Sequence, residues 1–197
     1  MKKTIFSKAV AFTAAFGLVA TAFSAQSFAA ETTGESTTTI TGGSLTGGDI
    51  QFNTITGTLD GTRTTGEANW NISKIVNARG TGASWSLQLT LSQFQEVDSS
   101  GAVVSDGYIF NENSLKVKTS PVITQFDDSS SNPSDISTVA TGVALDTGSP
   151  VQIISAGENE GMGSFEVSDL GVELSIPANA YARTYKATAT VTLNETP

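Results

Sequence analysis

The sequence contains no cysteine and no histidine, and it has few cations, with 10 Lys plus Arg among 197 residues. These absences exclude disulfides, thiolate or imidazole metal ligands, a Cys nucleophile and a Ser-His-Asp triad. Only carboxylate, Lys or Tyr chemistry remains open, so the composition argues against an enzyme. The 19 Asp plus Glu give a net charge of −9. That charge argues against nucleic acid as a partner, because phosphate binding needs a surplus of cations.

The first 29 residues have the pattern of a Sec signal peptide. Lys2, Lys3 and Lys8 form a positive region, an uncharged apolar stretch continues to Phe28, and small residues precede a cleavage position after Ala29. We therefore expect a secreted, extracellular protein with no transmembrane segment in its mature form; an N-terminal membrane anchor is the alternative. Cleavage removes three Lys and no acid, so the net charge falls from −9 to −12.

Alternation between apolar and polar residues dominates the chain after a Thr- and Gly-rich stretch at residues 30–39, which we expect to be a flexible leader. It runs through residues 68–72, 85–91, 172–176 and 185–194. A period of two predicts strands with one buried face, and the Asp-Gly pairs favour tight turns between them. We therefore predict one all-β domain over residues 40–197. An antiparallel two-sheet sandwich is expected, with jelly-roll-like and immunoglobulin-like topologies both open.

A polar loop at residues 127–135 carries three carboxylates. Such a loop could hold Ca²⁺, which takes oxygen ligands, but the spacing of a calcium-binding loop motif is missing. A solvated loop tip is the favoured interpretation. We accordingly predict no cofactor and no metal site.

Two stretches that are far apart in the sequence carry paired motifs. In residues 77–87 a Gly-rich turn leads into Trp85-Ser86-Leu87. In residues 185–197 the spaced residues are Tyr185, Thr190, Leu193 and Pro197. Together they resemble the WxL domain of Gram-positive surface proteins. Ala189 and Val191 depart from the family pattern, in which Leu and a second Trp are usual at these positions.

The resemblance implies a non-enzymatic surface protein that attaches non-covalently to peptidoglycan or another cell-wall polymer, often within a complex of surface proteins. It identifies as candidate wall-binding residues Trp85, Leu87, Arg79, Tyr185, Leu193 and Pro197. Two alternatives of a different kind stay open. The domain could be a self-assembling or partner-docking structural subunit, or an adhesin that binds a polysaccharide or a host ligand.

Each candidate also has a structural interpretation. The Trp85 indole could stack on glycan rings, but it shares a strand face with Leu87, Leu89 and Leu91, which favours a place in the core. The Arg79 guanidinium could bind a carboxylate or phosphate of the wall, or it could hold the carbonyls of its own turn. The sequence leaves both questions open.

Overall fold

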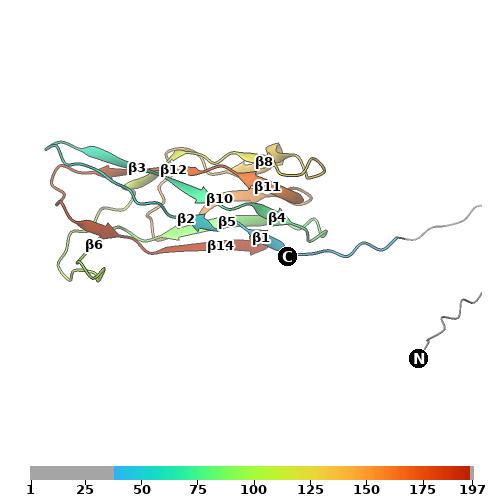
Figure 1. Cartoon of the computed structure of the whole chain (residues 1–197), viewed down its shortest axis with the longest axis horizontal. Coiled ribbons are helices and arrows are strands. Elements are labelled where there is room, and N and C mark those ends of the chain that lie inside the picture. The colour runs from blue at the N-terminus through green and yellow to red at the C-terminus, as the bar shows by residue number, and fades with distance from the viewer. Residues whose placement is uncertain (1–37, 196–197) are drawn as a thin grey trace, which may run out of the picture. The chain divides into compact units, whose positions relative to one another are not determined.

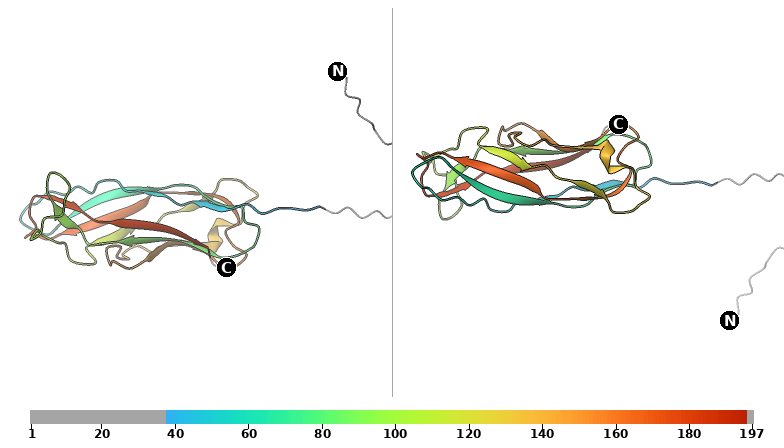
Figure 2. Two further views of the ribbon diagram at one scale, coloured as in Figure 1. Left: turned by 90° about the horizontal axis from the view of Figure 1, so that it is seen from below. Right: turned by 90° about the horizontal axis from the view of Figure 1, so that it is seen from above.

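The computed structural model describes residues 38–195, which form fourteen β-strands and one short 3-10 turn, Pro133–Asp135 (Figure 1). All strand pairs are antiparallel, which confirms the predicted all-β class. The strands run along the long axis of the domain (Figure 2). The predicted signal peptide (1–29), residues 30–37 of the predicted leader and Pro197 lie outside the described residues.

Eight strands form one layer, in which two four-stranded sheets continue each other. One sheet has the order β1 (Leu45–Gly47), β4 (Ile75–Asn77), β11 (Gly163–Val167), β8 (Ile123–Gln125). The other has the order β2 (Ile50–Gln51), β3 (Thr64–Ile72), β12 (Leu170–Ile176), β7 (Leu115–Thr119). The two orders match, since β1 leads into β2, β3 into β4, β7 into β8 and β11 into β12. The layer therefore consists of four chain passes, each interrupted once.

The other six strands form the second layer on the same plan. A four-stranded sheet has the order β14 (Ala189–Glu195), β5 (Trp85–Leu91), β10 (Val151–Ala156), β9 (Ile136–Thr138). A two-stranded sheet of β13 (Thr184–Lys186) and β6 (Gln95–Val97) continues β14 and β5. The expected two sheets are thus four hydrogen-bonded sheets, because the four passes of the first layer and the β14 and β5 passes of the second are each interrupted.

The interruptions are spanned by one repeated hydrogen-bond pair. Ser73, Ser92 and Ser168 each donate their backbone N–H to a carbonyl on the adjacent pass, and the serine hydroxyl accepts the N–H of that same partner. The partners are Asp49, Thr188 and Val122, at 2.7–3.0 Å in all six bonds. A hydroxyl thus takes the place of a ladder carbonyl, so the backbone groups at the breaks stay hydrogen-bonded.

Strand β5 supplies the centre of the core. Its residues Trp85, Leu87, Leu89 and Leu91 are at most 2 % exposed, and the residues between them are half-buried. The predicted alternation is confirmed here and in β12, where Val172, Leu174 and Ile176 are buried. These side chains belong to one hydrophobic cluster that joins both layers. Burying each such side chain stabilises the fold by about 1.5–3 kcal/mol.

Asp146 is an exception within this core, because it is a fully buried carboxylate. Its Oδ2 accepts the N–H of Ser114 at 3.0 Å, whereas Oδ1 has no hydrogen-bond partner among the described residues. Burial raises the pKa of Asp146 above the ordinary value of an aspartate, since it disfavours the charged form.

We expect Ser92→Ala to lower the free energy of unfolding by about 1 kcal/mol, because the Thr188 N–H loses its acceptor at the break. Urea denaturation of the purified domain measures the change. Ser99→Ala, at an exposed loop position, is the control and should leave stability unchanged. Equal stability of both variants would contradict the role given to the serine hydroxyl.

A second prediction concerns pH. A raised pKa in the folded state means that ionised Asp146 costs stability, and that this cost appears as the pH rises from the unfolded-state pKa through the folded-state pKa. Asp146→Asn cannot ionise. We therefore expect the melting temperature of the variant, relative to that of wild type, to rise between pH 3 and pH 7.

Asp60→Asn provides the control of opposite sign. Hydrogen bonds from Thr62 lower the pKa of Asp60, so the ionised carboxylate stabilises the folded state. The melting temperature of Asp60→Asn, relative to that of wild type, should therefore fall as the pH rises. Melting curves at several pH values test both variants. A difference in melting temperature between Asp146→Asn and wild type that does not change with pH would refute the raised pKa of Asp146.

Candidate functional site

The two motif stretches lie side by side, although they are far apart in the sequence. Strand β14 pairs with β5 so that Glu195 lies opposite Trp85, Leu193 opposite Leu87, and Val191 opposite Leu89. Val191, at the position of the second family Trp, is half-buried and packs against the core cluster. The β-branched Val191 therefore packs at the position where the family usually has its second Trp.

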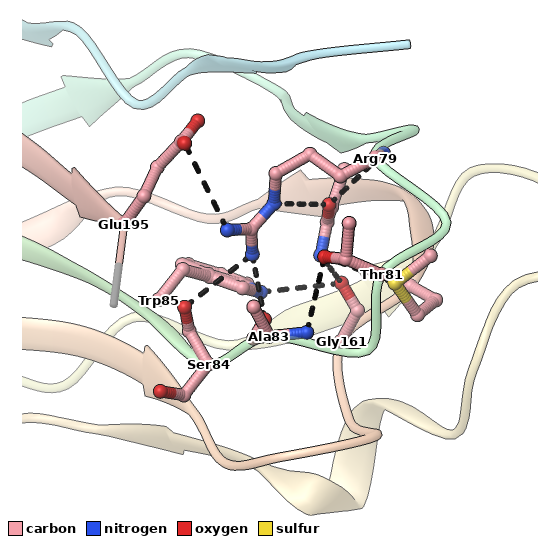
Figure 3. A network of polar contacts seen from close by, with 9 residues as sticks. Arg79, Thr81, Ala83, Ser84, Trp85, Gly161 and Glu195 are labelled. Carbon is pink, nitrogen blue, oxygen red and sulfur yellow. Dashed lines mark hydrogen bonds and ion pairs between the residues drawn. The ribbon is translucent and has the colours of Figure 1, made fainter. Parts of the chain in front are cut away.

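A polar network closes the end of the domain where the first motif turns into β5 (Figure 3). The Gly161 carbonyl accepts the Asn77 amide Nδ2 at 3.0 Å and the Trp85 indole Nε1 at 3.2 Å. Asn77 Oδ1 in turn accepts Arg79 Nε at 3.0 Å. We call the set Asn77, Arg79, Ala83, Ser84, Trp85 and Gly161 the motif network.

Arg79 holds its own turn. Its Nη2 donates to the carbonyl of Ala83 at 2.7 Å and to that of Ser84 at 3.4 Å. Nη1 lies 4.0 Å from a carboxylate oxygen of Glu195 on β14, and the Arg79 side chain is only 8 % exposed. The five-donor guanidinium therefore fixes the turn and faces the end of the C-terminal strand.

Trp85 and Leu87 have no surface to offer a ligand in this structure, being 1 % and 0 % exposed. The site is also closed from the Gly161 side. Gly161 has a φ of +61°, and a Cβ there would lie 2.8 Å from the indole nitrogen of Trp85. The packing interpretation of Trp85 and Leu87 accounts for both side chains, whereas glycan stacking on the buried indole finds no support here.

A large groove opens elsewhere, where the chain leaves the β2 ladder after Gln51. It has a volume of about 1120 Å³ and lies between residues 52–59 and residues 180–189. Its lining includes six large apolar side chains, those of Trp70, Leu91, Phe94, Phe110, Leu174 and Ile176. We call this feature the aromatic groove. Its dimensions suit a small ligand or part of a polymer.

Aromatic rings on both walls define the groove. On one wall Phe52, 43 % exposed, packs edge-to-face against Trp70 with ring centroids 4.9 Å apart. On the other, Tyr185 packs against Phe110 at 4.8 Å, and its hydroxyl donates to the carbonyl of Tyr181 at 2.8 Å. Burial raises the pKa of Tyr185 above the ordinary value of a tyrosine. Tyr181 itself is 61 % exposed.

The candidate residues from the sequence are therefore divided. Tyr185 lines the aromatic groove. Arg79, Trp85 and Leu87 belong to the buried end of the domain, and Leu193 is half-buried opposite Leu87. Sequence reasoning missed Phe52 and Tyr181; the available signal was a large aromatic residue within an otherwise irregular segment.

The acidic loop uses one of its carboxylates locally, since Asp127 accepts the backbone N–H of Ser129 at 2.9 Å and also its hydroxyl. These hydrogen bonds lower the pKa of Asp127. In residues 38–195 no three carboxylates gather as they would around a metal ion. No helix in the same residues is long and apolar enough to cross a membrane.

Strands β5 and β14, which carry parts of the two motif stretches, thus pair within one all-β domain. Residues 44–197 match the family model described as "WxL domain surface cell wall-binding". The chain belongs to this family, and it is accordingly a cell-wall-binding protein of the cell surface. No curated protein matches the chain, and no solved structure matches it.

We expect Arg79→Lys to lower the free energy of unfolding by about 1–3 kcal/mol. A lysine ammonium cannot reproduce the planar fork that reaches Asn77 and the Ala83 carbonyl at once. Arg63→Lys is the matched control, because exposed Arg63 makes one side-chain hydrogen bond, to Ser175. Chemical denaturation measures both, and equal stabilities would contradict the structural role of Arg79.

Proposed function

We propose that this protein is secreted and attaches non-covalently to peptidoglycan through the aromatic groove, while the motif network holds the fold. The wall-binding description of the family supports attachment in general. We choose the groove as the binding surface because its Phe52 and Tyr181 side chains are exposed, whereas the Trp85 side chain is buried.

Stacking is the physical basis of this proposal. Sugar rings have apolar faces and hydroxyl edges, and aromatic side chains combine apolar area with a fixed orientation. Three threonines of the irregular segment also line the groove, at positions 54, 56 and 58. Their hydroxyl groups both donate and accept hydrogen bonds, as sugar hydroxyls require.

The charge of the mature chain favours contacts of this kind. At −12 the protein is repelled at long range by an anionic wall, with screening over about 8 Å at physiological salt. Attachment then depends on short-range stacking and hydrogen bonding. The proposal includes secretion by the predicted Sec signal peptide at residues 1–29, because the wall lies outside the membrane.

A second function has a specific observation in its favour. Strand β14 lies first in its sheet and pairs only with β5 among the described strands. Thr190 and Thr192 are exposed on the outer face of this strand. An unpaired edge of this kind is a surface on which another strand can dock, as a structural subunit would require.

Co-sedimentation of the mature domain with purified peptidoglycan tests the proposal. We expect the wild type to pellet, and Tyr181→Ala and Phe52→Ala each to weaken binding about tenfold, which corresponds to about 1.4 kcal/mol. Phe126→Ala is the control, because Phe126 is 59 % exposed and does not line the groove. Melting temperatures verify that each variant is folded.

Failure of the wild type to pellet would refute wall attachment. Equal losses in Tyr181→Ala and Phe126→Ala would refute the groove as the site. Size-exclusion chromatography in the absence of peptidoglycan tests the second function, which predicts oligomers.

A further inference from the structure

The free edge of β14 differs from the other sheet edges in length and in cover. The edge strands β1, β2, β6, β8, β9 and β13 have two or three residues each. Strand β7 has five residues, but hydrogen bonds join Leu115 and Val117 to residues 142–145 on its outer side. Strand β14 has seven residues and no hydrogen-bond partner on its outer side among the described residues (Figure 1). It is therefore the longest uncovered edge in this part of the chain.

The residues of β14 do not protect this edge against pairing. Natural sheets protect an exposed edge with lysine, proline, a bulge or a covering segment. From Ala189 to Asn194 the strand has no charged residue and no proline, and its register with β5 contains no bulge. Glu195 is its one charged residue, and the carboxylate lies 4.0 Å from Arg79 Nη1. The edge is thus open to another strand.

The hydrogen bonds of β5 show which backbone groups of β14 face the free edge. The Ser92 N–H donates to the Thr188 carbonyl on the β14 side, whereas the Leu91 carbonyl accepts the Gly148 N–H on the other side of β5. These directions alternate along an antiparallel ladder, so every second residue of β14 points its N–H and C=O groups away from β5. These residues are Ala189, Val191, Leu193 and Glu195.

The apolar side chains of the same residues are only partly covered. Val191 and Leu193 pack against the hydrophobic cluster but stay half-buried. Leu89 and Leu87, which lie opposite them on β5, are fully buried. A strand added to the edge would remove further apolar surface of Val191 and Leu193 from water, which favours association.

We propose that β14 pairs with β14 of a second copy of this chain, antiparallel and about a two-fold axis at Thr192. This inference rests on the second function proposed for the β14 edge, and it names the partner. With Thr192 opposite Thr192 of the second copy, Val191 pairs with Leu193 and Ala189 with Glu195. The outward N–H and C=O groups of both strands then bond to each other. The two four-stranded sheets become one continuous sheet.

Charge and symmetry favour a second β14 over other occupants of this edge. Two chains of net charge −9 repel each other, so they approach most easily along a surface with few carboxylates. The two-fold register places Glu195 opposite Ala189, away from the second Glu195. A strand formed by residues 30–39 of another copy would instead add the carboxylates of Glu31 and Glu35 to the edge. A two-fold contact also closes on itself, so it gives a dimer.

A single introduced cysteine tests this contact, because the chain has no cysteine of its own. Thr192→Cys would place two thiols directly opposite each other in a pair without backbone hydrogen bonds. The Cα atoms of such a pair are about 4.5 Å apart, within the range of about 4.4–6.8 Å that a disulfide spans. In a buffer of oxidised and reduced glutathione, we expect the mature variant to form a disulfide-linked dimer on a non-reducing gel.

Thr190→Cys is the matched control, since Thr190 is also exposed on the outer face of β14. In the proposed register Thr190 lies opposite Asn194 of the second copy. The two Thr190 positions are then about 14 Å apart, too far for a disulfide. Melting temperatures verify that both variants are folded. The inference is overturned if both variants cross-link equally, if Thr190→Cys alone cross-links, or if neither does.

Sedimentation velocity of the mature protein tests the same contact without a cross-link. We expect the wild type to show a monomer–dimer equilibrium. Thr192→Lys sets two like charges directly opposite each other and should raise the dissociation constant of the dimer about fivefold. Thr124→Lys, at an exposed threonine of the edge strand β8, is the control and should leave the constant unchanged. Equal dissociation constants for the two variants would speak against β14 as the interface.

Failure of this inference can be separated from failure of the proposed functions. If the wild type forms oligomers while Thr192→Cys does not cross-link, the second function stands and the pairing of β14 with itself is refuted. If the wild type stays monomeric at every concentration, the second function and this inference fail together. Pelleting with peptidoglycan tests wall attachment independently of both results.

Discussion

The pairing of β14 with β5 is the interaction on which the rest of the domain depends. It joins the last strand of the chain to the strand that carries Trp85 and Leu87 at the centre of the core. The same pairing continues, across the hydrogen bonds between Ser92 and Thr188, into β13 and β6. Through this continuation it positions Tyr185 in the wall of the aromatic groove.

The motif network has a physical reason that does not involve a ligand. A turn buried at the end of a sandwich leaves backbone carbonyls without water, and each one needs a donor. Asn77, Arg79 and Trp85 supply donors to the carbonyls of Gly161, Ala83 and Ser84. Asn77, Arg79 and Trp85 of the first motif thus stabilise the fold through these hydrogen bonds.

The sequence predicts the strands well, because a half-buried strand must alternate its side chains, and 85–91 and 172–176 do so clearly. It could not predict the interruptions of the strands. The sequence does not distinguish a serine with a solvent-facing hydroxyl from one whose hydroxyl accepts a backbone N–H in place of a carbonyl, as those of Ser73 and Ser168 do. The sequence did not predict the aromatic groove either. Phe52 and Tyr181 come from segments far apart in the sequence, and the tertiary fold brings both into the lining of one groove.

The central claim, that the motif tryptophan supports the fold while the groove binds the wall, can be tested by one spectrum. The chain has two tryptophans, so an ¹⁵N-labelled sample gives two indole N–H signals. Trp70 lines the groove and donates to the Asn53 carbonyl at 3.1 Å, whereas Trp85 donates to Gly161 at the buried end. Titration with soluble peptidoglycan fragments should shift the Trp70 signal and leave that of Trp85 in place. A shift of the Trp85 signal alone would contradict the account.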